Sequence, residues 1–219
     1  MTERILCLLI GYGFGLFQTA YIYGRIKGID IRTKGSGNAG TTNALRTFGL
    51  KAGLITAAGD VMKCVLAVIV TWLIFKGISP LPYKTICIYT AAGVILGHNY
   101  PFYLKFRGGK GIAAACGMIF AFLEWPMIVV GLICFFGFLL ITHYMSLASL
   151  SVSAEFFAGV VIFGQLGWYG MSTPLLIELY ILTGILTAIA FLMHRSNIAR
   201  LIAGNERKTY LFGSKKSDQ

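Results

Sequence analysis

The chain has 219 residues, of which 57% are hydrophobic and only 12% are charged, and its formal net charge is +11. A soluble domain of this length carries roughly 25% charged residues, so the composition excludes an ordinary soluble protein and indicates an integral membrane protein. No linker-like stretch divides the chain, which predicts a single transmembrane domain over residues 1–219 with a short basic cytoplasmic tail at about residues 205–219.

Apolar segments follow one another along the whole chain and predict an all-α integral membrane protein with seven transmembrane helices. The first, second and last segments are long enough to span as ordinary helices, whereas the third, fourth and sixth are short. Short segments beside polar motifs are typical of helices that stop or break where the backbone lines a wet cavity. The segments are residues 5–24, 52–75, 86–97, 111–123, 127–142, 154–167 and 175–193.

The distribution of lysine and arginine predicts the orientation of these helices. With seven spans, fifteen of the nineteen basic residues fall in the loops of one side, at residues 25–51, 98–110 and 194–219. Basic loops stay in the cytoplasm, so we expect an external N-terminus and a cytoplasmic C-terminus. Anionic lipid headgroups and anionic substrates account for the positive charge without nucleic acid.

A glycine-rich polar motif at residues 34–46 interrupts this apolar background. Glycine lets backbone N–H groups line a hollow, and hydroxyl, amide and guanidinium groups bind phosphate oxygens. Ser36 or Asn38 is predicted to cap a helix that begins near Gly40 and carries Arg46. A solvated loop is the alternative. The candidate phosphate ligands besides Ser36 and Arg46 are Gly37, Asn38, Gly40, Thr42 and Asn43.

A second polar motif follows the third apolar segment. Pro101 is expected to end the preceding helix, and glycines then allow a tight turn with Lys110 at the start of the next one. Lys110 is therefore a candidate anion ligand, although a basic loop obeying the positive-inside rule is the alternative. The spacing is not that of a nucleotide-binding P-loop. Further candidates in this motif are His98, Asn99, Gly108 and Gly109.

Two more polar elements belong to the same side of the membrane. His194 and Asn197 are three residues apart and would share one face of a continuing helix, where they could bind a hydroxyl or a phosphate. Ser146 and Ser149 lie in a hydroxyl-rich segment predicted to be a cytoplasmic loop. The basic residues that follow are assigned to the helix end and the lipid surface; they are Arg200, Arg207, Lys215 and Lys216.

Asp60 and Lys63 fall inside the second apolar segment, three residues apart. An intramembrane charge is a functional candidate, but here mutual pairing favours a structural role. The five cysteines have no Cys-x-x-Cys spacing and the three histidines are scattered, so no metal site is expected.

In their order along the chain, these motifs resemble those of the PlsY family of bacterial acyl-phosphate:glycerol-3-phosphate acyltransferases. The resemblance covers nearly the whole chain, and the ordered set is specific although each motif alone is weak. The matching segments are Ser36-Gly37-Asn38-x-Gly40-x-Thr42-Asn43-x-x-Arg46, Gly97-His98-Asn99-Tyr100-Pro101, Phe106-x-Gly108-Gly109-Lys110-Gly111, Ser146-Leu147-Ala148-Ser149 and His194-Arg195-x-Asn197-Ile198-x-Arg200.

The resemblance implies transfer of a fatty acyl group from acyl phosphate to the 1-hydroxyl of sn-glycerol 3-phosphate. The products would be 1-acylglycerol 3-phosphate (lysophosphatidate) and phosphate, in the first acylation of phospholipid synthesis. It implies a bacterial cytoplasmic (inner) membrane location, a site facing the cytoplasm, no metal and no cofactor. Membrane lipid and the upstream enzyme that forms acyl phosphate are candidate partners.

The catalytic core expected from these motifs consists of Ser36, Arg46, Lys110, His194 and Asn197. Two phosphorylated substrates repel each other, and Arg46 and Lys110 would offset that repulsion. The proton acceptor stays open between His98, His194 and a substrate phosphate oxygen. Other functions left open are a transporter for a phosphorylated solute and a scaffold that binds anionic lipid.

Overall fold

Helices make up the structure, a computed structural model that describes residues 1–210. Within this range no strand forms, so the all-helical expectation is confirmed. The predicted basic tail lies partly outside the described residues, as do Lys215 and Lys216. The α-helices are α1 Thr2–Gly15, α2 Thr19–Ile26, α3 Thr41–Phe48, α4 Leu50–Phe75, α5 Tyr83–Asn99, α6 Ile112–Phe122, α7 Trp125–Thr142, α8 Met145–Gln165, α9 Thr173–Met193 and α10 Arg195–Ile202, and the short 3-10 turns are η1 Ile31–Thr33 and η2 Phe102–Leu104.

Every apolar segment predicted from the sequence coincides with helices, and within residues 1–210 five stretches are long and apolar enough to cross a membrane. The apolar α6 is shorter, at ~17 Å for its 11 residues. The five candidate spans are Thr2–Ile26, Leu50–Phe75, Trp125–Thr142, Met145–Gln165 and Thr173–Met193.

The sixth segment differs from its prediction. It was expected to be short, with Ser146 and Ser149 in a loop, but α8 has 21 residues and both serines lie in its first turns. Ser149 donates to the carbonyl of Met145 at 2.7 Å. A hydroxyl that bonds back within its own helix can be buried among apolar neighbours, so the polar sequence does not end the helix here.

The first segment is broken between α1 and α2, and side chains satisfy the carbonyls that the break leaves unpaired. The buried Gln18 amide donates to the carbonyls of Gly15 and His98 at 3.1 and 3.0 Å. The carbonyl of Leu16 accepts from the Tyr103 hydroxyl at 2.6 Å. Unpaired backbone groups are costly away from water, so these hydrogen bonds allow the helix break to be buried.

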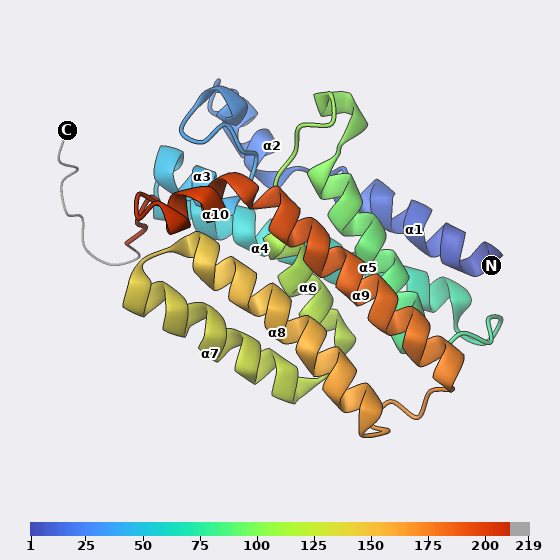
Figure 1. The fold of residues 1–219 in the computed structure, drawn as a ribbon. Helices are drawn as coiled ribbons and strands as arrows, with labels where there is room; N and C mark the ends of the chain where they lie inside the picture. Colours follow the sequence, from blue (N-terminus) through green and yellow to red (C-terminus); the bar gives the residue numbers. More distant parts are fainter. Residues whose placement is uncertain (211–219) are drawn as a thin grey trace.

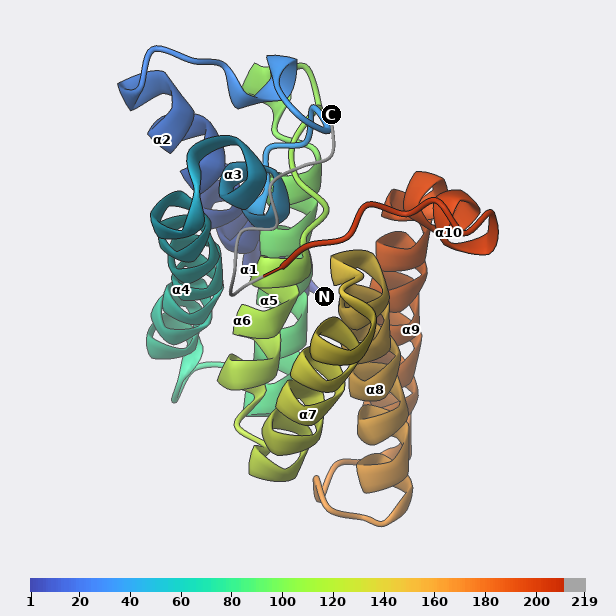
Figure 2. The same ribbon diagram turned by 90° about the vertical axis from the view of Figure 1, so that its left-hand side faces the viewer.

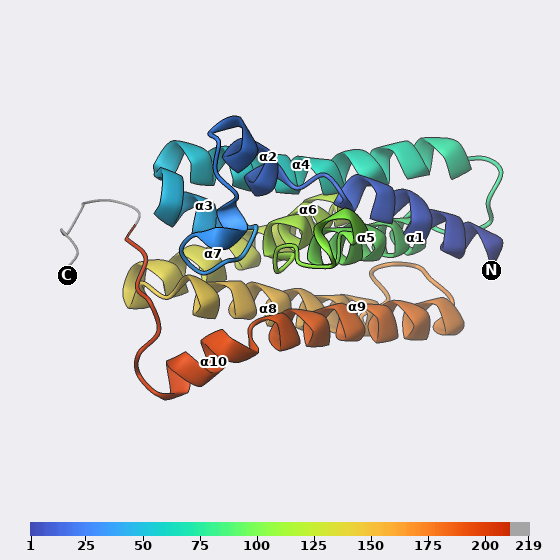
Figure 3. The same ribbon diagram turned by 90° about the horizontal axis from the view of Figure 1, so that it is seen from above.

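The helices form a bundle whose long members run side by side, while α2, α3 and α10 gather at one end (Figures 1 and 2). The N-terminus lies at the opposite end from α3 and α10 (Figure 3). Many apolar side chains along α7 are exposed, such as Ile133, Leu140 and Ile141. An apolar outer surface of this kind is what hydrocarbon requires.

Candidate active site

The polar loop before α3 is held in shape by Asn43. The buried Asn43 side chain accepts from the backbone N–H of Ser36 at 2.9 Å and donates to the carbonyl of Lys34 at 3.0 Å. Gly37 has a φ of +73°, in the region that favours glycine. The Asn43 amide therefore orders the loop. The polar side chains of Ser36 and Asn38 line the cavity described below.

Helix α3 begins at Thr41, within one residue of the predicted start, and carries Arg46 as expected. The expected cap is wrong: the N-cap is Gly40, and no side chain caps the helix. The first N–H groups of a helix lack intrahelical partners, and without a cap they stay available to an anion. Arg46 does not turn back toward them, but donates to the Arg207 carbonyl at 3.1 Å and the Thr209 hydroxyl at 2.7 Å.

The loop between α5 and α6 places Lys110. Helix α5 ends at Asn99, ahead of Pro101, as predicted. The N–H groups of Gly108 and Gly109 then bond back to the carbonyls of Asn99 and His98, at 3.2 and 3.1 Å. A side chain at Gly109 would collide with the His98 ring, so this close approach requires glycine.

Lys110 precedes the N-cap of α6, and its ammonium donates to the side-chain oxygen of Asn197 on α10. Burial is the main cause that lowers the pKa of Lys110, to about 8, and the neighbouring Arg200 and Arg46 add to it. Asn197 donates in turn to Glu206 at 2.6 Å. The Asn197 amide thus links the Lys110 ammonium to the Glu206 carboxylate through two hydrogen bonds.

His194 lies at a break between α9 and α10, so the continuing helix expected there is wrong. Its Nδ1 is 2.8 Å from the carbonyl of Ala190. A carbonyl only accepts, so Nδ1 carries the proton and Nε2 keeps a free lone pair. Burial, followed by the nearby Lys110 charge, lowers the pKa of His194 to about 4. The imidazole is consequently neutral near pH 7.

A single cavity of about 700 Å³ unites these elements. Its polar end is formed by the 34–46 motif, Lys110, His194 and Asn197, and its other end is apolar and lies along α6 and α7. All predicted site residues line it except Asn99 and Gly109. Asn99 lines a small separate cavity and Gly109 packs on His98. The apolar lining includes Phe120, Ile128, Leu132, Phe135 and Phe136.

The structure adds site residues that the sequence did not assign. Arg200 and Arg207, assigned to the lipid surface, line this cavity instead. The buried Glu206 accepts from Arg200 at 2.7 Å and from Ser146 at 3.2 Å. An acidic residue within a basic segment was the available signal for Glu206, because a buried carboxylate requires partners.

Residues 205–210 extend from α10 across the polar end of the bundle. The Thr209 N–H donates to the His143 carbonyl at 2.8 Å, and the rings of His143 and Tyr210 lie 4.5 Å apart. Together with the two Arg46 bonds, these contacts fasten this segment, which we call the C-terminal strap, to α3 and to the α7–α8 turn.

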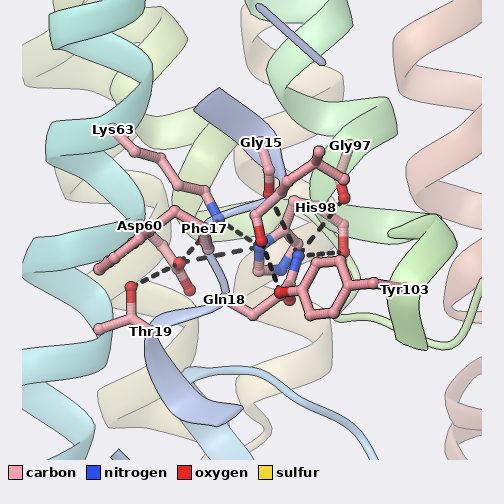
Figure 4. A network of polar contacts seen from close by, with 10 residues as sticks. Gly15, Phe17, Gln18, Thr19, Asp60, Lys63, Gly97, His98 and Tyr103 are labelled. Carbon is pink, nitrogen blue, oxygen red and sulfur yellow. Dashed lines mark hydrogen bonds and ion pairs between the residues drawn. The ribbon is translucent and has the colours of Figure 1, made fainter. Parts of the chain in front are cut away.

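A buried polar network reaches the cavity wall at Asp60 and His98 (Figure 4). The Lys63 ammonium contacts Asp60 Oδ1 at 2.9 Å, the Phe17 carbonyl at 2.7 Å and His98 Nδ1 at 2.7 Å. Asp60 also accepts from the Thr19 hydroxyl at 3.0 Å. The pair that was assigned a structural role thus joins the break after α1 to α4 and α5.

The described residues contain no cluster of three or more His, Cys, Asp or Glu side chains that could hold a metal ion. The fold and the cavity define a class: an integral membrane protein whose amphiphilic cavity carries cations and free N–H groups at one end and apolar side chains at the other. Such a site fits a ligand with a phosphate head and a long apolar chain.

Comparisons with known proteins agree with this class. The family model described as glycerol-3-phosphate acyltransferase matches residues 5–204. A glycerol-3-phosphate acyltransferase of Clostridioides difficile (strain 630) is 38% identical over 219 residues, covering 97% of each chain. One of Thermoanaerobacter sp. (strain X514) is 36% identical over 206 residues, covering 93% of this chain and 94% of the relative.

Two solved structures share the fold. The glycerol 3-phosphate form of PlsY, an integral membrane glycerol 3-phosphate acyltransferase, has a TM-score of 0.79 at 28% identity and covers 94% of this chain and 96% of its own. The lysophosphatidic acid form has a TM-score of 0.75 at 26% identity, with 94% of each chain covered. The chain belongs to the glycerol-3-phosphate acyltransferase family, and the sequence-based resemblance is confirmed.

Proposed function

We propose that this protein transfers a fatty acyl group from acyl phosphate to the 1-hydroxyl of sn-glycerol 3-phosphate. The products are 1-acylglycerol 3-phosphate and inorganic phosphate. The observation that carries this proposal is the single cavity in which Arg46, Lys110 and His194 meet an apolar channel between helices. Membership of the glycerol-3-phosphate acyltransferase family supports it.

The cations in the cavity would offset the repulsion between the two phosphate groups of the substrates. Two phosphate groups must come close in a site of low dielectric, where their repulsion is strong unless cations compensate it. Arg46 would hold one phosphate, and Lys110 would neutralise charge that develops on the leaving phosphate. Backbone N–H groups of the 34–41 loop and the hydroxyl of Ser36 would complete the anion site. The acyl chain would lie against Phe120, Leu132 and their apolar neighbours.

The reaction itself needs no enzyme nucleophile, because acyl phosphate is already activated. The 1-hydroxyl oxygen bonds to the acyl carbon, the bond from that carbon to the phosphate oxygen breaks, and phosphate leaves. The free lone pair on His194 Nε2 would orient the hydroxyl. A histidine whose pKa is about 4 is a weak base, so we assign the proton to a substrate phosphate oxygen.

We further propose seven transmembrane spans, with the short α5 and α6 included, in the bacterial inner membrane. The N-terminus would face outward and the site would face the cytoplasm. The excess of basic residues in the loops of one side supports this orientation. The upstream enzyme that forms acyl phosphate is a candidate partner, because it would supply this substrate at the membrane.

One assay separates this function from its alternatives. Purified protein in detergent is supplied with acyl phosphate and glycerol 3-phosphate, and phosphate release and lysophosphatidate are measured. We expect equal amounts of both products, and we expect EDTA to leave the rate unchanged. Absence of product from folded protein, together with uptake of glycerol 3-phosphate into proteoliposomes, would replace the enzyme with a transporter.

A further inference from the structure

Lys63 has a bonding pattern that decides the protonation of its neighbour. Its Nζ has three contacts of 2.7–2.9 Å, one each to the break after α1, to α4 and to α5. An ammonium has three N–H donors and no lone pair. If Lys63 is charged, all three neighbours must accept, including His98 Nδ1.

The charge on Lys63 follows from Asp60. Both side chains are almost fully buried, at 4% and 1% exposure, and they are ion-paired at 2.9 Å. A neutral lysine would leave the carboxylate with only the Thr19 hydroxyl and no ion-pair partner, which is far more costly than a buried ion pair. Among the described residues, Lys63 and Asp60 are the charged groups that face the His98 ring.

With Nδ1 accepting from Lys63, the His98 proton must lie on Nε2. That nitrogen faces Gly109, where a side chain would collide with it, and His98 lines the cavity beside Gly108 and Lys110. His194 has the opposite arrangement, because its Nδ1 donates to a carbonyl and its Nε2 is free. The two histidines are therefore opposite tautomers, with the proton on Nε2 in His98 and on Nδ1 in His194.

We propose that Lys63 is a positioning residue that fixes His98 as the Nε2–H tautomer. His98 then directs its Nε2–H at the turn that carries Gly109 and Lys110, and it does not act as a base. This inference rests on the proposed acyltransferase function for its activity readout, but the tautomer itself can be measured without turnover.

The first test is nitrogen-15 NMR of histidine-labelled protein in detergent, with signals assigned through single His→Asn variants at His98, His143 and His194. We expect a protonated Nε2 and a bare Nδ1 at His98, and the reverse at His194. In Lys63→Met, His98 should lose its single tautomer while His194 keeps its own. Lys76→Met, an exposed position just after the same helix, serves as the matched control and should change neither signal. A protonated Nδ1 at His98 in the unaltered protein would overturn the inference.

The second test compares two replacements of His98. The longer amide of His98→Gln can place an N–H donor near the former Nε2, whereas the amide of His98→Asn is too short, and neither is a base. We expect His98→Gln to keep kcat/KM within about 10-fold of the unaltered enzyme, and both His98→Asn and Lys63→Met to lose roughly 10- to 100-fold, as loss of a supporting residue does. Equal, large losses in His98→Gln and His98→Asn would assign His98 to base catalysis. An unaltered enzyme that is folded but inactive would instead refute the proposed function.

Discussion

The protonation states of Lys110 and His194 depend strongly on how deeply each side chain is buried. In the proposed reaction Lys110 acts as a cation, yet burial lowers its pKa to about 8, so its charge is retained by a modest margin at neutral pH. His194 is kept neutral by the same burial. The two groups would therefore limit activity from opposite sides of the pH scale.

The first expectation is a bell-shaped dependence of kcat/KM on pH. As pH rises through about 8, Lys110 loses its proton and activity should fall. As pH drops toward about 4, His194 gains a proton and its Nε2 can no longer accept. Lys110→Met should have a low rate without the alkaline limb. An alkaline limb that survives in Lys110→Met would assign it to another group.

A second expectation concerns Arg46. Arg46→Ala should lower kcat/KM roughly 100- to 1,000-fold, the usual cost of removing a charged or oxyanion-type contact in a catalytic site. Arg46→Lys should recover little, because an ammonium cannot present two parallel N–H groups. Steady-state kinetics with both substrates varied measures this, and Lys51→Ala, an exposed basic residue at the start of α4, is the control. Near-normal turnover of Arg46→Ala would remove Arg46 from the anion site.

At the scale of helices, close packing depends on small residues. Helix α1 lies against α5 so closely that a Cβ at Gly11 would collide with the Thr90 carbonyl, whereas a Cβ at Gly13 would meet nothing within 4 Å. In hydrocarbon, helices associate through such contacts because there is no hydrophobic driving force between them.

The third expectation uses this pair of glycines on one helix. Gly11→Ala should destabilise the protein by about 1–3 kcal/mol, as overpacking does. Gly13→Ala should be neutral or slightly stabilising, since alanine favours helix more than glycine. Thermal unfolding in detergent, followed by tryptophan fluorescence, compares the two. Equal melting temperatures would show that α1 can move away from α5 at little cost.

Helix positions were predictable from the sequence because apolar segments of this length must be helical in a membrane. The exact residues at which the helices begin and end were less predictable. The break after Gly15 depends on Gln18 and Lys63, which come together only in the fold. Likewise, the start of α8 extends through Ser146 and Ser149 because their hydroxyls find acceptors, and composition alone does not reveal those acceptors.

At the scale of the whole molecule, charge and chemistry are segregated to one end. The polar motifs predicted to share a side of the membrane do line one cavity, and the N-terminus lies at the far end (Figure 3). The sequence could place these motifs on a common side but could not show that Glu206 and Arg207 fold back among them. That return depends on the contact of Arg207 with Arg46 on α3 and on the contact of Glu206 with Ser146 on α8, and these partners are distant in sequence.

The fourth expectation tests the proposed orientation. In intact spheroplasts, a membrane-impermeant maleimide should label Lys76→Cys, after α4, and should label Lys27→Cys only once the membrane is opened. Both positions are exposed in the structure. The unaltered protein corrects for its own five cysteines. The opposite labelling pattern would invert the topology.

The C-terminal strap has a consequence for truncated forms of the protein. Thr209 accepts from Arg46 and donates its N–H to the carbonyl of His143, so this one residue joins α3 to the α7–α8 turn. A stop codon or a protease cut before Thr209 would remove no residue of the polar motifs and would leave the Arg46 bond to the Arg207 carbonyl, yet it would remove the Thr209 hydroxyl from Arg46 and the Thr209 N–H from the His143 carbonyl. Thr209, which belongs to none of the polar motifs, would thus help to hold the two sides of the proposed active site together.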